Sequence, residues 1–81
     1  MKLDYHPRVA RQLADAPAAV RRAFDGKVTL LAGNLRHPSL RAKKYDEAND
    51  VWQARVTRGW RFYFQIQDDT YVILSVVAHP K

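Results

Sequence analysis

The chain has 81 residues and a net charge of +6, and 47% of its residues are apolar. This composition predicts a single domain over residues 1–81 with a packed core, and it argues against intrinsic disorder. The absence of cysteine excludes disulfides, thiolate metal sites and cysteine nucleophiles. No apolar run approaches the about 20 residues that span a membrane, and residues 1–20 carry charges throughout, so we expect no signal peptide and a cytoplasmic protein.

The first third of the sequence predicts a short strand followed by two helices. Leu3 and Tyr5 alternate with polar neighbours, which is typical of a strand with one buried face. Pro7 suits the first position of a helix, which we expect to end at Pro17. A second helix should end near Gly33, because apolar residues recur at helical spacing before it, at Val20, Phe24, Val28 and Leu31.

Residues 34–50 predict irregular structure, and from residue 51 the apolar period changes from helical to alternating. We predict three strands, at residues 51–56, 60–67 and 70–78, because these segments are rich in β-branched and aromatic residues. The predicted fold class is α+β, with two N-terminal helices packed on a twisted, mainly antiparallel four-stranded sheet in the order βααβββ.

The first hairpin predicts its own register. A three-residue loop at 57–59, with Gly59 in the left-handed conformation, fixes which residues of the two strands face each other. One side of the hairpin is then apolar and should meet the helices, with the facing pairs Trp52 and Phe64, Ala54 and Phe62, and Val56 and Trp60.

The other side of the same hairpin carries Gln53 opposite Tyr63 and Arg55 opposite Arg61. Two facing arginines repel each other, and folding alone does not require them. Guanidinium groups form bidentate contacts with phosphate, and Tyr63 and Gln53 are suited to stack on bases or hydrogen-bond to them. The alternative is a solvated sheet face on which the two arginines point apart.

Proton transfer is the second chemical function that the sequence offers. His79 follows the last predicted strand, and a histidine beside arginines can move protons during phosphodiester cleavage, although a frayed terminal histidine is the simpler interpretation. Lys43 and Lys44 lie in a segment without acidic residues, where a lysine can serve as a base with a lowered pKa or remain a solvated loop residue. No metal or cofactor motif is present, so we expect neither.

Four segments, taken in order, resemble one known family over nearly the whole chain. They are LRAKKY at 40–45, DVWQARV at 50–56, GWRFYF at 59–64 and the closing strand with its histidine at 70–79. The order of elements and these segments resemble the RelE/ParE superfamily of bacterial toxin–antitoxin toxins, and within it the RelE-like mRNA interferases.

The resemblance implies a toxin that cleaves mRNA in the A site of the 70S ribosome without a metal ion. The substrate 2′-OH would attack the adjacent phosphorus and leave a 2′,3′-cyclic phosphate. Arg61 matches the family arginine at the scissile phosphate, with Arg55 assisting. Lys44 or Lys43 would bind phosphate or take the proton, and His79 would act as general acid, or as base in the alternative assignment. The further RNA-binding residues would be Lys43, Arg41, Gln53, Tyr63 and Arg58.

The partners implied by the resemblance are a cognate antitoxin, mRNA and ribosomal RNA, with no membrane. Two alternatives stay open: a non-enzymatic ParE-like inhibitor of gyrase, and an inactive RelE-fold module that binds RNA or an antitoxin. Gln53 stands where some relatives have a basic residue. The sequence also ends at Lys81, before the C-terminal helix of many relatives, which favours the inactive module.

Overall fold

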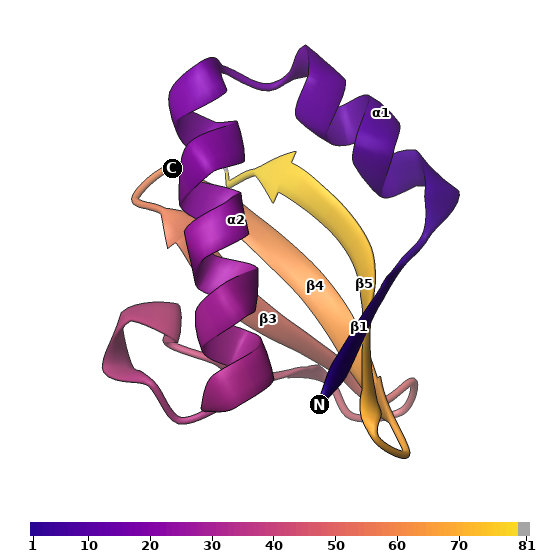
Figure 1. Ribbon diagram of the computed structural model, residues 1–81. Coiled ribbons are helices and arrows are strands. Elements are labelled where there is room, and N and C mark those ends of the chain that lie inside the picture. Colours follow the sequence, from indigo (N-terminus) through magenta and orange to yellow (C-terminus); the bar gives the residue numbers. More distant parts are fainter. Residues whose placement is uncertain (80–81) are drawn as a thin grey trace.

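Two helices cover one face of a five-stranded sheet in the computed structural model, which describes residues 1–79 (Figure 1). The chain starts with β1 (Lys2–Tyr5), α1 (Pro7–Asp15) and α2 (Ala18–Gly33). Pro7 opens α1, and the His6 side chain caps it by accepting a hydrogen bond from the Arg8 amide at 3.1 Å. The predicted strand, both helices and the break at Pro17 are confirmed.

The segment predicted to be irregular contains two short elements, so the expectation of four strands is wrong by one. A 3₁₀ helix, η1 (Pro38–Leu40), is followed by the strand β2 (Lys43–Asp46), which pairs antiparallel with β3 (Val51–Thr57). β2 has only four residues, and three of them are charged, so it carries no apolar alternation. An edge strand of this kind forms by pairing with its neighbour rather than through its own propensity.

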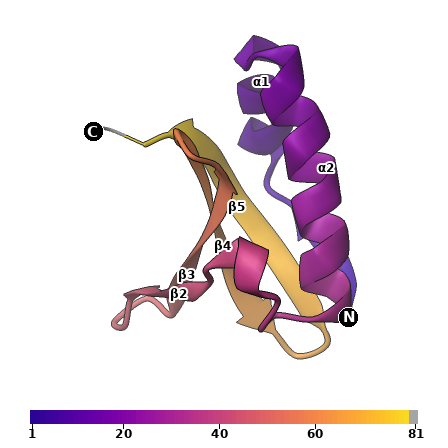
Figure 2. The same ribbon diagram turned by 90° about the vertical axis from the view of Figure 1, so that its left-hand side faces the viewer.

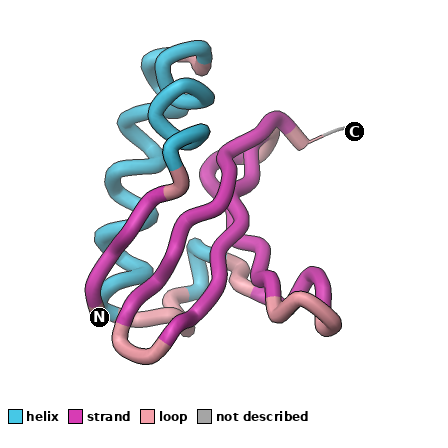
Figure 3. Tube along the Cα trace, turned by 90° about the vertical axis from the view of Figure 1, so that its right-hand side faces the viewer, coloured by secondary structure: helices cyan, strands magenta, loops and turns pink. Residues whose placement is uncertain are grey.

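The sheet order is β1-β5-β4-β3-β2, which includes β4 (Trp60–Gln67) and β5 (Thr70–Ala78). β1 runs parallel to β5, and all other pairs are antiparallel. Figure 3 shows the first strand beside the last one, in front of the helical layer. No helix within residues 1–79 is long and apolar enough to cross a membrane.

The register of the β3–β4 hairpin agrees with the prediction in four pairs and differs at the loop. Trp52, Gln53, Ala54 and Arg55 face their predicted partners, but Thr57 rather than Val56 faces Trp60. The connection is therefore a two-residue loop of Arg58 and Gly59, and Val56 is an extra residue in β3. Gly59 has no positive φ, so the predicted left-handed glycine is also wrong. The bulge allows the short loop and the register of the rest of the hairpin to occur together. Val56 stays in the core and is 2% exposed.

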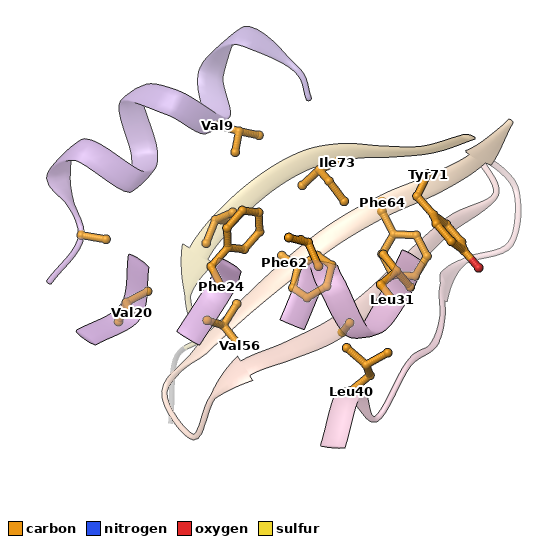
Figure 4. Packing of buried hydrophobic residues seen from close by; sticks show 14 residues of the cluster. Val9, Val20, Phe24, Leu31, Leu40, Val56, Phe62, Phe64, Tyr71 and Ile73 are labelled. Atoms are coloured by element: carbon orange, nitrogen blue, oxygen red, sulfur yellow. The ribbon is translucent and has the colours of Figure 1, made fainter. Parts of the chain in front are cut away.

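The core lies between α2 and the apolar face of the sheet (Figure 4). Phe24 of α2 meets Phe62 of β4 edge-on, with ring centroids 5.6 Å apart, and Phe62 neighbours Phe64 at 5.7 Å. The helical and alternating periods predicted this arrangement, because each directs one apolar face toward the other layer. The opposite face of the sheet is thereby left to polar residues.

Besides its apolar packing, α1 is joined to the sheet by one side-chain hydrogen bond, which gives a test of the fold. Gln12 Oε1 accepts a hydrogen bond from the amide of buried Val76 at 2.8 Å, beyond the point where β1 stops pairing with β5. We expect Gln12→Ala to lower the free energy of unfolding by about 1–3 kcal/mol, because it leaves a buried N–H without a partner. Urea unfolding measures this, with exposed Arg11→Ala as control; equal effects of the two changes would contradict the assignment.

Candidate active site

Both helices lie on one side of the sheet (Figure 2), and the polar face of the β3–β4 hairpin is on the other side, since Ala54 and Phe62 face the core. Period-two alternation places Arg55 and Arg61 there as a directly facing pair. Short β2 pairs with β3 only as far as Gln53, so β3 has an unpaired edge from Ala54 onward. This corner, where the hairpin face meets the free edge, is where the candidate site forms.

A cavity of about 230 Å³ occupies this corner. It brings together four basic side chains, a histidine, an amide and a small apolar residue, namely Arg41, Lys43, Arg55, Arg61, His79, Gln53 and Ala54. They come from the end of η1, from β2, β3 and β4, and from the residue after β5. Six of the nine residues predicted from the sequence thus line one cavity, and no acidic residue lines it.

The Arg61 side chain is held by the hairpin loop. Its Nη1 donates to the carbonyl oxygens of Thr57, Arg58 and Trp60 at 2.8, 3.2 and 3.0 Å. Within residues 1–79, the Nε and Nη2 groups have no hydrogen-bond acceptor, so they can donate to a ligand in the cavity. A guanidinium fixed before the ligand arrives is suited to stabilise charge that develops during a reaction.

His79 is anchored to the same loop. Its backbone amide donates to the Gly59 carbonyl at 2.8 Å, immediately after β5 ends at Ala78. The bond fixes the backbone of His79 beside the hairpin turn, and exposed His79 lines the same cavity as Arg61. A histidine in this position is close enough to the arginines of the cavity to be a candidate for proton transfer.

The cavity concentrates positive charge. Desolvation, followed by the charges of Arg41, Arg61 and Arg58, lowers the pKa of Arg55 below its usual value, although an arginine stays protonated. The two ion pairs recorded among residues 1–79 join Lys2 to Asp69 and Lys44 to Asp50, both outside this cavity. Like charges that gather without carboxylate partners favour the binding of a polyanion.

Lys44 does not join the other candidates. β-strand alternation turns it away from Lys43, so that its ammonium lies 5.1 Å from the centre of the Trp52 ring and forms an ion pair with Asp50. The hydrogen bond to Asp50 is the main reason why the pKa of Lys44 is raised, opposite to the expectation of a lowered value. Lys43 is therefore the lysine of the cavity.

Tyr63 and Arg58 lie beside the cavity rather than in its wall. Gln53, which is 8% exposed, donates through Nε2 to the Tyr63 hydroxyl at 3.0 Å. Tyr45 packs edge-on against Tyr63, with centroids 4.8 Å apart. The half-buried ring of Tyr63 and the exposed ring of Tyr45 extend the site along the sheet face, where bases could stack.

Lys27 of α2 lies close to two arginines of the cavity, which the sequence analysis did not predict. Its Nζ donates to the Ser39 carbonyl at 2.9 Å. Desolvation, and next the charges of Arg55 and Arg41, lower the pKa of Lys27 below its usual 10.5. The helical period assigns Lys27 only to a polar helix face, because its approach to β3 depends on how α2 packs across the sheet.

The lowered pKa of Lys27 predicts a pH-dependent stability. Between the lowered value and 10.5 the unfolded chain binds more protons than the folded chain, so this lysine makes the protein more stable as the pH rises. Lys27→Met lacks this contribution, and its stability relative to wild type is expected to fall as the pH rises from neutral toward 10.5. Urea unfolding at both pH values measures the difference; a constant difference would contradict the shift.

The sequence matches no protein-family model and no curated protein sequence. Solved structures do match. The isolated RelE toxin of E. coli is 19% identical at a TM-score of 0.78, covering 99% of this chain and 85% of that one. A YoeB/ParE toxin from Agrobacterium tumefaciens is 12% identical at 0.81, with 99% and 100% covered. RelE in the archaeal RelE–RelB complex from Pyrococcus horikoshii is 19% identical at 0.77, with 99% and 96% covered. Over the residues that the structure describes, the chain therefore has the fold of the RelE and YoeB toxins.

Proposed function

We propose that the protein is the toxin of a toxin–antitoxin module and a metal-independent endoribonuclease that cuts mRNA in the ribosomal A site. The observation that carries the proposal is the single cavity lined by Arg55, Arg61, Lys43 and His79. The fold shared with RelE and YoeB toxins supports it. A gyrase inhibitor would need no such cluster of phosphate-binding and proton-transfer groups.

The reaction follows from the roles of the cavity residues. The 2′-oxygen of one nucleotide forms a bond to the adjacent phosphorus, and the bond from phosphorus to the 5′-oxygen breaks, which yields a 2′,3′-cyclic phosphate and a 5′-OH. Arg61, assisted by Arg55, stabilises the negative charge of the transition state. His79 donates a proton to the departing 5′-oxygen, and Lys43 binds the phosphate or accepts the 2′-OH proton. The alternative assignment exchanges the acid and base roles.

Primer extension on mRNA in a translating extract tests the proposal. With the protein added, we expect cuts within translated codons, little cutting of naked RNA and unchanged supercoiling by gyrase. Inhibited gyrase with intact mRNA would replace the proposal by the ParE-like function. If the mRNA stays intact and gyrase stays active, both activities are excluded. The remaining alternative is then an inactive module that binds RNA or an antitoxin.

A cognate antitoxin is the proposed protein partner. Similar chains were solved as RelB–RelE and YoeB–YefM complexes. The basic cavity of this chain is suited to an acidic antitoxin segment, which would block Arg61 and raise the melting temperature of the toxin by binding only its folded state. Cytoplasmic localisation belongs to the same proposal, because ribosomes and the antitoxin are found there.

A further inference from the structure

A second cavity adjoins the candidate active site. It measures about 440 Å³ and lies at the free edge of β3, where η1 packs against both α2 and β3. Lys27, Ser39, Arg58 and Thr57 line it, and it shares Arg41 and Arg55 with the first cavity. The two cavities therefore adjoin at these two arginines.

We propose that this second cavity binds the neighbouring phosphate of the substrate RNA strand, through Lys27, Arg41 and Arg58. The inference rests on the proposed function and assigns a second phosphate position to it. Neither the motifs of the sequence nor the active-site geometry alone assigns a role to Lys27.

Two features hold the cations of the second cavity in place. The carbonyl of Ser39 accepts the hydrogen bond from Lys27 Nζ, which directs the ammonium toward the arginines. Arg41 has φ 47° and ψ 42°, a left-handed conformation that is uncommon for a residue with a side chain, and its amide donates to the Pro38 carbonyl at 3.3 Å. Unfavourable backbone conformations of this kind concentrate at ligand sites. Here the conformation sets Arg41 between the two cavities.

The charges favour a ligand with consecutive negative groups. Among residues 1–79, no recorded ion pair involves Lys27, Arg41, Arg55 or Arg58, so four cations share this edge of β3 without a carboxylate. Burial, and after it the charges of neighbouring arginines, lowers the pKa values of Lys27 and Arg55. One anion in each cavity would relieve the repulsion between these cations, and a single RNA strand supplies both from adjoining phosphates.

The test compares the binding of two short RNAs that cannot be cleaved. A 2′-O-methyl dinucleotide has one phosphate and the corresponding trinucleotide has two. For wild type we expect the second phosphate to increase affinity about 10-fold, the size of one added charged hydrogen bond. It should also steepen the dependence of log affinity on log salt by about 0.7. Lys27→Met should lose both gains, and Lys27→Arg should keep them.

The control is Lys2→Met, which removes the same charge at the opposite edge of the sheet and should keep the full gain. Thermal melting establishes that each variant is folded. The second site is overturned if Lys27→Met still binds the trinucleotide more tightly than the dinucleotide by the full factor. It is also overturned if wild type shows no difference in affinity between the two RNAs. If Lys27→Met weakens binding to whole ribosomes but not to the trinucleotide, the second site is also overturned. The phosphate that Lys27 contacts would then belong to ribosomal RNA.

Failure of this inference is distinguishable from failure of the proposed function. Protein that cuts mRNA but shows no Lys27-dependent gain is a nuclease without the second site. Protein that shows the gain but leaves translated mRNA intact has the second site without the nuclease activity.

Discussion

Replacing Arg61 with alanine is expected to lower the rate of mRNA cleavage by about 10²–10³-fold, the usual loss when one fixed charge contact to a transition state is removed. The side chain lines the cavity and is held before any ligand binds, because Nη1 donates to the carbonyls of Thr57, Arg58 and Trp60 at the hairpin turn. Single-turnover cleavage of mRNA on programmed ribosomes measures the rate. The control is Arg22→Ala, a charge removed from the exposed side of α2.

The fold should survive this change, since Arg61 lies on the polar face and its bonds go to carbonyls at the end of the hairpin rather than to the core. We expect a stability loss of about 0.5–1.5 kcal/mol, visible as a small decrease in melting temperature. Arg61→Lys should remain well below wild type, because an ammonium group cannot reproduce the two-pronged contact of a guanidinium with phosphate. If Arg61→Ala cleaves as fast as Arg22→Ala does, the assignment of the cavity as the active site is wrong.

His79→Ala should lower cleavage by about 10²–10⁴-fold, the range found when a general acid or base is lost. The backbone bond from His79 to Gly59 does not depend on the side chain, so the loop is expected to keep its conformation. Lys44→Ala is the matched control, because this lysine is paired with Asp50 outside the cavity and should leave the rate almost unchanged. Rates are compared under the same single-turnover conditions.

A nearly wild-type rate in His79→Ala would assign the proton step to Lys43, the lysine of the cavity. Lys43→Ala would then be the variant with the large loss. If neither change affects the rate, water must complete the reaction and the acid–base part of the proposal is wrong.

Much of the architecture was predictable because it repeats a local pattern. Phe24 and its helical neighbours, like Phe62 and Phe64, mark one apolar face per element, and the facing arginines follow from the period of two. The bulge at Val56 was not predictable, since a three-residue loop and a two-residue loop followed by a bulge fit the same alternation. Gly59 suggested the longer loop, but it adopts no left-handed conformation.

The site was predictable only where its residues lie on strands recognised from the sequence. Arg55 and Arg61 met that condition. Lys43 could not be separated from Lys44, because β2 forms only through its pairing with β3 and no local period showed which of the two faces the cavity. The position of Lys27 could not be predicted for another reason. Lys27 lies on a helix and comes near the arginines only through the tertiary packing of that helix on the sheet.

The parallel pairing of β1 with β5 has a consequence for folding during synthesis. Lys2 pairs with Thr70 and Tyr5 pairs with Ile73. The first strand therefore cannot pair until nearly all of the described chain has been synthesised. Pairing across so much of the sequence is slow, because the entropy of closing the loop must be overcome before the contact contributes. Arg61 and His79 also lie late in the sequence. A growing chain can therefore form its helices early, but it has no complete cavity while the ribosome that makes it is still translating β4 and β5.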